Sequence, residues 1–469
     1  MKNKKEYFWA LLGRFIPQTI YLLTTIILAR FLSPQDFGMI GVLTLFCTIS
    51  SVLMDSGLGG SLIKENKITN LDCSSIFVFN IIISLILYFT LFICSDYIEY
   101  YFSHKGLSEV TKLLCLVFII NSWGIVPKSI LMRELNFKAI GKISIISVII
   151  ASIISIILGV NGYGVYALIA YQLVNSLINV ILLIKESTYK ISFKFSYHSF
   201  MKLIPFGAFT TLVTCIDTLY ENMITFLFGK YYNIQQAGYF YQAKKIEEVP
   251  SHSLISTING VAFSVLTKYK DTPNEFISES NKILKTISAF MIPLLLTISL
   301  FSEPIINLLY GEKWNLAAVY LSILMFAGIF ILLENINRNF IKSLGKVSLL
   351  FRYTIIKRVL GILLILGIAY LSPQYVLYAY IVSSLLGYLI NNHVYCKLMN
   401  ISVMSQIIVV IKLLAPGLFY YGLIYILGFW LDLPYQIFVS SFILIIYYFK
   451  ILSLYNINLI KRIKSVILK

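Results

Sequence analysis

The sequence alternates long apolar stretches with short polar gaps along its whole length. Each stretch is about twenty residues long, the length at which an α-helix crosses the roughly 30 Å hydrocarbon core of a bilayer. Hydrophobic residues make up 58% of the chain and charged residues only 13%. We therefore predict an all-α polytopic membrane protein with about 14 transmembrane helices and no room for a soluble domain. The predicted spans are 9–29, 37–54, 74–95, 111–131, 141–160, 164–184, 203–228, 239–267, 284–302, 316–337, 349–371, 374–395, 404–430 and 433–455.

Basic residues gather in every second gap between the predicted spans. Lys4 precedes the first span, Lys64 follows the second, and Lys464 follows the last. Lysine and arginine accumulate in the cytoplasmic loops of membrane proteins. The pattern predicts that both termini are cytoplasmic. It also accounts for most of the formal net charge of +17 as a topology signal, so we expect no nucleic-acid partner.

The gaps and the cysteines limit the chemistry that the chain can perform. No gap between spans is longer than about seventeen residues, which leaves no extramembrane catalytic domain. The six cysteines show neither a CxxC motif nor a Cys/His spacing that would suit a metal. We predict no disulfide, no metal site and no cofactor, and we expect that the protein is not an enzyme.

One short motif occurs twice, 200 residues apart. Residues 29–38 read ARFLSPQDFG and residues 229–238 read GKYYNIQQAG, with a base, aromatic residues, a turn residue, glutamine and glycine in register. Each copy joins the first and second spans of its half, and six spans per half give both halves the same orientation. Parallel repeats are a recurrent transporter plan with the substrate site between them. The predicted domains are an N-terminal lobe (1–200), a C-terminal lobe (201–400) and two additional helices with a cytoplasmic tail (401–469).

Several stretches together resemble one family. They are the 29–38 motif, Asp55–Leu58 after the second span, and Gly238–Ala243 leading to Val249 and Pro250. With the six-plus-six-plus-two arrangement, they resemble the polysaccharide and O-antigen flippases (Wzx-like) of the multidrug/oligosaccharidyl-lipid/polysaccharide exporter superfamily.

The resemblance implies a function and partners. It implies translocation of an undecaprenyl-diphosphate-linked oligosaccharide from the cytoplasmic to the periplasmic leaflet of the bacterial inner membrane, by alternating access around a cationic cavity. It implies further that the last two helices form a groove for the lipid tail. The partners expected on this basis are the lipid-linked glycan, membrane lipids, and a polysaccharide polymerase with its chain-length regulator.

Charged side chains inside the predicted spans are candidate site residues, because each costs about 2.5–3.5 kcal/mol at the bilayer centre. Arginine suits a diphosphate, since its planar fork donates two hydrogen bonds at once. We assign diphosphate binding to Arg14 and Arg358, with Lys357 behind them. Adjacent helical residues point about 100° apart, so at most one of Lys357 and Arg358 faces a cavity squarely. The alternative for Arg14 is that its side chain reaches the headgroups.

Acidic residues in the spans suggest a second site. Asp217 and Glu221 are spaced i, i+4 and share one helix face, where they could carry a proton or bind Na⁺ as a coupling ion. The alternative is that they neutralise the cavity cations as structural ion pairs. Glu334 and Arg338 have the same spacing and are interpreted as an intrahelical pair.

Two other functions stay open. A multidrug or cation antiporter of the same superfamily shares the fold but favours an acidic or apolar cavity. An O-antigen polymerase is a membrane enzyme and is expected to carry a sizeable periplasmic loop with basic residues. The longest outward gap here is short and holds only His104, Lys105 and Lys112 as candidates.

Overall fold

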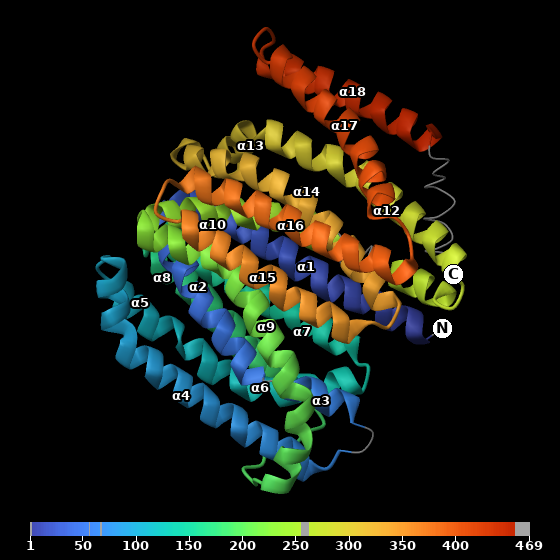
Figure 1. Ribbon diagram of the computed structural model, residues 1–469. Helices are drawn as coiled ribbons and strands as arrows, with labels where there is room; N and C mark the ends of the chain where they lie inside the picture. Colours follow the sequence, from blue (N-terminus) through green and yellow to red (C-terminus); the bar gives the residue numbers. More distant parts are fainter. Residues whose placement is uncertain (1, 56, 66–67, 255–261, 455–469) are drawn as a thin grey trace. The chain divides into compact units, whose positions relative to one another are not determined.

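The protein is helical, as its apolar stretches predict. The computed structural model describes residues 2–55, 57–65, 68–254 and 262–454, and this part of the chain contains helices and no strand (Figure 1). Ten helices in it are long and apolar enough to cross a membrane, by length and composition. The prediction of an all-α polytopic membrane protein is therefore confirmed.

About half of the predicted spans agree with a helix to within four residues at both ends, and several helices are longer than predicted, such as α12, which begins eleven residues before the predicted span 284–302. The long helices are α1 (Lys2–Phe31), α2 (Pro34–Asp55), α4 (Asn70–Phe102), α6 (Leu116–Arg133), α7 (Phe137–Val160), α8 (Val165–Glu186), α9 (Tyr197–Tyr231), α10 (Ile234–Glu248), α12 (Pro273–Leu300), α14 (Asn315–Ser343), α15 (Val347–Ile368), α16 (Pro373–Met399), α17 (Val403–Leu427) and α18 (Leu433–Leu454). The short ones are α3 (Leu58–Lys64), α5 (Leu107–Leu114) and α13 (Ser302–Leu309).

Two predicted spans differ from the structure in their interior. The span 111–131 bends at Cys115, which separates α5 from α6 but keeps a helical backbone. The span 239–267 begins as α10 and passes into a π-helix at Val249–Leu254; residues 255–261 lie outside the described part of the chain. Pro250 lies in this π-helix and has no N–H to donate, which accounts for the local change of hydrogen-bond register.

The chain divides into two compact units. The first comprises Met1–Gln242 with Leu309–Trp314, and the second comprises Ala243–Leu308 with Asn315–Lys469. These units follow from packing, whereas the predicted lobes follow from the sequence repeat. The lobe boundaries at 200 and 400 stay a prediction.

Small residues let the helices of the first unit approach closely. Helix α1 packs against α7, and α2 packs against α9. A Cβ added to Gly13 of α1 would lie 2.5 Å from Cα of Gly141 in α7, so the two backbones almost touch. Membrane helices associate through such small-residue contacts, because lipid supplies no hydrophobic drive between helices.

The two repeated motifs meet inside the first unit. A Cβ added to Gly38 would lie 1.8 Å from the carbonyl oxygen of Ile234, and one added to Gly238 would lie 1.8 Å from that of Pro34. The two contacts are related by the same 200-residue offset as the sequence motifs. Reciprocal contacts of this kind are what a two-fold relation between two segments produces.

The segment Leu309–Trp314 packs against the C-terminal end of α1. The buried indole of Trp314 donates to the carbonyl of Ala29 (2.9 Å), and Lys313 Nζ donates to the carbonyls of Arg30 (3.0 Å) and Leu32 (2.7 Å). The last carbonyls of a helix lack intrahelical donors. Lys313 therefore satisfies them and places a positive charge at the negative end of the helix dipole.

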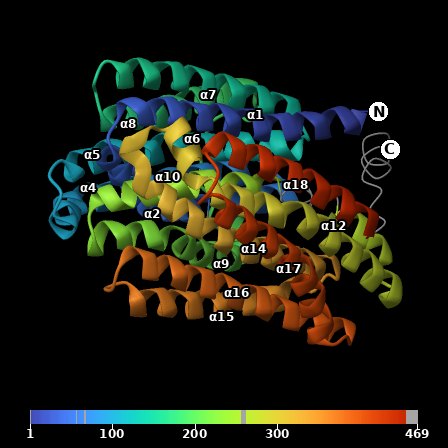
Figure 2. The same cartoon turned by 90° about the horizontal axis from the view of Figure 1, so that it is seen from above.

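In the second unit, α14 lies against α16, and α15 lies beside α16, as the two views show (Figures 1 and 2). Helix α12 packs against α14 and α17, and α17 against α18. Helix α15 has Arg352, Lys357 and Arg358 among apolar residues, which keeps it outside the ten helices that qualify by composition. Lys357 and Arg358 belong to the candidate functional site.

Candidate functional site

A buried ion pair joins α14 to α15. Lys357 Nζ lies 2.5 Å from Oε1 of Glu334, and their side chains are only 1% and 5% exposed. Asn391 of α16 completes the contact: its Oδ1 lies 3.4 Å from Lys357 Nζ, and its Nδ2 donates to the Glu334 carbonyl (3.2 Å). Buried charges persist only when they are paired and hydrogen-bonded, and here three helices supply the partners.

Arg358 extends this pair into a cluster with excess positive charge. Its guanidinium Nη2 lies 3.7 Å from the same Glu334 oxygen, and its side chain is 13% exposed. Two cations thus share one carboxylate. Lys357 is enclosed with Glu334, and Arg358 is the more exposed of the two cations.

Gly387 of α16 makes room for the carboxylate. A Cβ at this position would lie 2.6 Å from Oε2 of Glu334. The i, i+4 spacing pairs Glu334 with Arg338 and gives no sign of the contact with Lys357. Gly387, in the middle of the predicted span 374–395, was the available signal, because glycine in the middle of a helix costs stability and is favoured where a neighbour approaches closely.

Arg14 lies on the polar stripe of α1. At 100° per residue, it is within about 20° of Tyr21 and Thr25 and about 180° from Leu23. Tyr21 and Thr25 line a small internal cavity, and the Tyr21 ring contacts that of Tyr171 on α8 at 5.1 Å. Leu23 is 54% exposed on the protein surface. Arg14 is itself exposed, on the side of α1 opposite this apolar surface.

Asp217 and Glu221 lie on one face of α9, about 40° apart. Asp217 is half-buried and Glu221 is exposed. One residue beyond Glu221, Asn222 donates from Nδ2 to Thr48 Oγ1 of α2 at 3.3 Å. The structure thus groups Arg14, Asp217 and Glu221 in the first unit, and Lys357 with Arg358 in the second.

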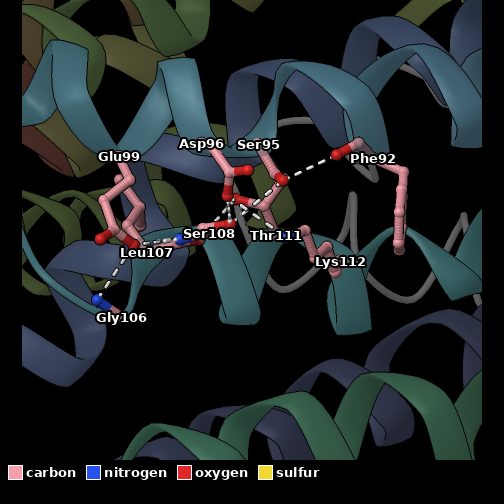
Figure 3. Close-up of polar contacts among 9 residues, drawn as sticks. All are labelled: Phe92, Ser95, Asp96, Glu99, Gly106, Leu107, Ser108, Thr111 and Lys112. Atoms are coloured by element: carbon pink, nitrogen blue, oxygen red, sulfur yellow. Dashed lines mark hydrogen bonds and ion pairs between the residues drawn. The ribbon is translucent and has the colours of Figure 1, made fainter.

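The segment between α4 and α5 is a hydrogen-bonded corner (Figure 3). Glu99 accepts from the backbone N–H groups of Gly106 (3.1 Å) and Ser108 (2.9 Å), which satisfies the first donors of α5. Asp96 accepts from the Ser108 hydroxyl (2.5 Å) and pairs with Lys112 (3.2 Å). Lys112, one of the few basic residues of this predicted outward gap, therefore holds the corner together.

The matches to known proteins agree with the helical architecture described above. The family described as "Polysaccharide biosynthesis protein" matches residues 27–319. Lipopolysaccharide biosynthesis protein WzxC of Escherichia coli (strain K12) is 24% identical over 358 residues, which are 76% of this chain and 72% of WzxC.

Two solved structures are similar to the whole fold. Lipid II flippase MurJ in an inward closed conformation has a TM-score of 0.77 at 17% identity, with 96% of this chain and 98% of MurJ covered. An inward-facing multidrug resistance MATE family transporter of the MOP superfamily has a TM-score of 0.62 at 17% identity, with 84% of this chain and 99% of the transporter covered. At these identities the similarity establishes the fold.

The ten membrane-length helices of the described residues and the similarity to a bacterial polysaccharide protein identify a multi-pass protein of the bacterial inner membrane. Because the matched residues span more than half of the sequence, the chain belongs to the polysaccharide biosynthesis protein family. This confirms the resemblance to polysaccharide exporters that the repeated motif and its neighbours indicate.

Proposed function

We propose that the protein is a flippase for lipid-linked polysaccharide precursors. It moves an undecaprenyl-diphosphate-linked oligosaccharide from the cytoplasmic to the periplasmic leaflet by alternating access. Family membership supports the pathway, and the similarity to a lipid II flippase over 96% of the chain supports the mode of action. No bond is made or broken in this process, which agrees with the absence of a catalytic motif from the sequence.

The observation that carries the proposal is the placement of the two arginines. Arg14 lies on the polar stripe of α1, opposite exposed Leu23, and Arg358 is the more exposed of the two α15 cations that pair with Glu334. Each arginine can donate two hydrogen bonds to a diphosphate. Lys357 contributes by pairing with Glu334 at 2.5 Å, closer than Arg358 does.

The alternative functions have less support. An antiporter for cationic drugs would favour an acidic or apolar cavity, and it would gain support only if the intramembrane bases face lipid. Arg14 lies on the side of α1 opposite the exposed, apolar Leu23. A polymerase needs basic residues in an outward loop, and Lys112 there is engaged with Asp96.

Replacement of the arginines tests the function. We expect Arg14→Ala combined with Arg358→Ala to abolish surface glycan in cells, with an unchanged amount of protein in the membrane. Arg352→Ala on the same helix α15 is the matched control, because Arg352 is exposed, whereas Lys357 and Arg358 are the residues of this helix that pair with Glu334. Normal glycan display in the double variant would exclude the diphosphate role of both residues.

We propose in addition that the protein has 14 membrane spans, two parallel six-helix lobes and cytoplasmic termini. The reciprocal approach of Gly38 to Ile234 and of Gly238 to Pro34 supports a parallel repeat. Cysteine replacements at Ser33 and Asn233 should both react with a membrane-impermeant reagent added from outside. Labelling of the two positions from opposite sides of the membrane would contradict the parallel arrangement.

A further inference from the structure

A cavity lies wholly inside the first unit, between the end of α2, the short helix α3 and α6. Its volume is about 460 Å³, within the roughly 300–1,000 Å³ of small-molecule sites. It contains none of the residues to which diphosphate binding or ion coupling is assigned. Its lining includes Asp55, the first residue of the Asp55–Leu58 motif, to which the proposed function gives no role.

The walls of the cavity are held in place by specific contacts. Gly59 of α3 donates its backbone N–H to Asp55, and a Cβ on Gly59 would lie 2.7 Å from Asp55 Oδ1 and 2.9 Å from Ser129 Oγ. Arg133 Nη1 donates to the carbonyls of Leu62 (2.8 Å) and Glu65, which ties the end of α3 to α6. Only glycine at position 59 lets α3 lie this close.

Helix α6 supplies one wall of the cavity. Asn121, Ile125, Ser129 and Met132 are spaced three to four residues apart and share one face of the helix, with Lys128 beside them. Across from them stand Ser51, Met54 and Asp55 of α2 and Ile63 of α3. Hydroxyl and amide groups therefore alternate with apolar side chains around the space.

The charges that line the cavity indicate which kind of ligand it can bind. Lys128 and Asp55 offset each other, which makes the site a poor match for a diphosphate with its two negative charges. The neutral groups of Ser51 and Asn121 can donate and accept hydrogen bonds. A sugar ring offers hydroxyls at its edge and C–H groups on its faces, and this lining has partners for both.

We propose that this cavity binds a sugar unit of the lipid-linked glycan. The inference rests on the proposed function and adds to it a site for the glycan, separate from the arginines. In the predicted topology, α2 and α6 both end on the cytoplasmic side at this cavity. The sugar is thus held where the glycan starts its passage, and the site distinguishes a sugar-bearing lipid from the bare lipid.

The test compares two ligands on the purified full-length protein. One is the sugar-bearing undecaprenyl diphosphate that accumulates in a deletion strain, and the other is undecaprenyl diphosphate without sugar. We expect the wild type to bind the first about tenfold more tightly, a difference of about 1.4 kcal/mol. Ser51→Leu narrows the cavity and removes a hydroxyl from its wall, and it should bring this ratio close to one, with the affinity for the bare lipid unchanged.

A control variant and a second cavity variant complete the test. Ser51 is exposed and its hydroxyl donates to the Cys47 carbonyl four residues earlier. Thr90 of α4 is exposed and bonded in the same way to Ile86, so Thr90→Leu is the matched control and should keep the tenfold ratio. Asn121→Leu removes a polar wall from a different helix and should also lower the ratio, even if Ser51→Leu fails to fold.

The outcomes separate the two proposals. A tenfold preference that survives both Ser51→Leu and Asn121→Leu would overturn the sugar site and leave the flippase function intact. Equal wild-type affinity for the two lipids would do the same. If the wild type binds neither lipid, the proposed function fails, and the sugar site fails with it.

Discussion

Two regions of the molecule achieve close packing in opposite ways. Where the repeated motifs meet, Gly38 and Gly238 bring backbone against backbone, and no charge lies in the contact. Around Glu334, three helices of the second unit enclose an ion pair and a surplus cation. The first contact depends on shape alone and tolerates no added atom. The second depends on charge balance, so a change in charge should matter there more than a change in size.

The largest effect is expected at the glycine contact. Gly238→Ala places a methyl group 1.8 Å from the Pro34 carbonyl oxygen, a distance that forces the backbones apart. We expect a loss of more than about 3 kcal/mol in stability, beyond ordinary overpacking, together with loss of export. Thermal unfolding of the purified protein measures this.

A second glycine gives the control. Gly422 lies in α17, and an added Cβ there meets nothing within 4 Å. Gly422→Ala should stabilise the protein by about 0.5–1 kcal/mol, because alanine loses less entropy in a helix. The shape argument is wrong if Gly238→Ala unfolds no earlier than Gly422→Ala.

The next effect is expected at the ion pair. Lys357→Met removes the cation that Glu334 contacts at 2.5 Å, and the loss of one partner of a buried pair costs about 3–5 kcal/mol. Addition of Glu334→Gln should restore part of that stability, because it removes a buried carboxylate that has lost its 2.5 Å partner and keeps the longer 3.7 Å contact with Arg358. A double variant as unstable as Lys357→Met alone would show that packing, and not charge balance, holds this region.

The smallest effect is expected at the carboxylates of α9. Asp217→Asn with Glu221→Gln changes charge with little change in shape, so stability should stay within about 0.5 kcal/mol. If the pair binds the coupling ion, export should become slower and less dependent on the proton or sodium gradient, since a ligand shifts a conformational equilibrium only by its differential affinity.

Asp96→Asn is the control for this pair, because Asp96 is an exposed carboxylate of the α4–α5 corner. It should leave the gradient dependence of export unchanged. Gradient dependence that is the same in the wild type and in the Asp217 and Glu221 double variant would identify the pair as structural counter-ions.

The fold could be predicted because the bilayer fixes the length of its helices. The predicted spans 433–455 and 349–371 correspond to Leu433–Leu454 and Val347–Ile368. The π-helix at Val249–Leu254 was not foreseen, although Pro250 signalled an irregularity. A proline indicates that the helix must change, but the neighbouring groups that donate hydrogen bonds to the freed carbonyls decide how it changes.

The candidate site could be predicted only in part. Spacing along one helix identifies i, i+4 neighbours such as Glu334 and Arg338, and it brings Asp217 and Glu221 to one face. The contact from Glu334 to Lys357 joins two helices and depends on their rotation about their axes, which the sequence does not encode in any spacing. Gly387, opposite the carboxylate, was the one local sign of that approach.

The most direct test of the central claim is flipping by the purified protein in vesicles. Sugar-bearing undecaprenyl diphosphate is placed in one leaflet, and its arrival in the other is followed with a membrane-impermeant sugar-modifying reagent. The account predicts rapid flipping by the wild type and by Arg352→Ala, and a rate near that of empty vesicles for Arg14→Ala with Arg358→Ala. Wild-type flipping no faster than in empty vesicles, or undiminished flipping by the double variant, would contradict it.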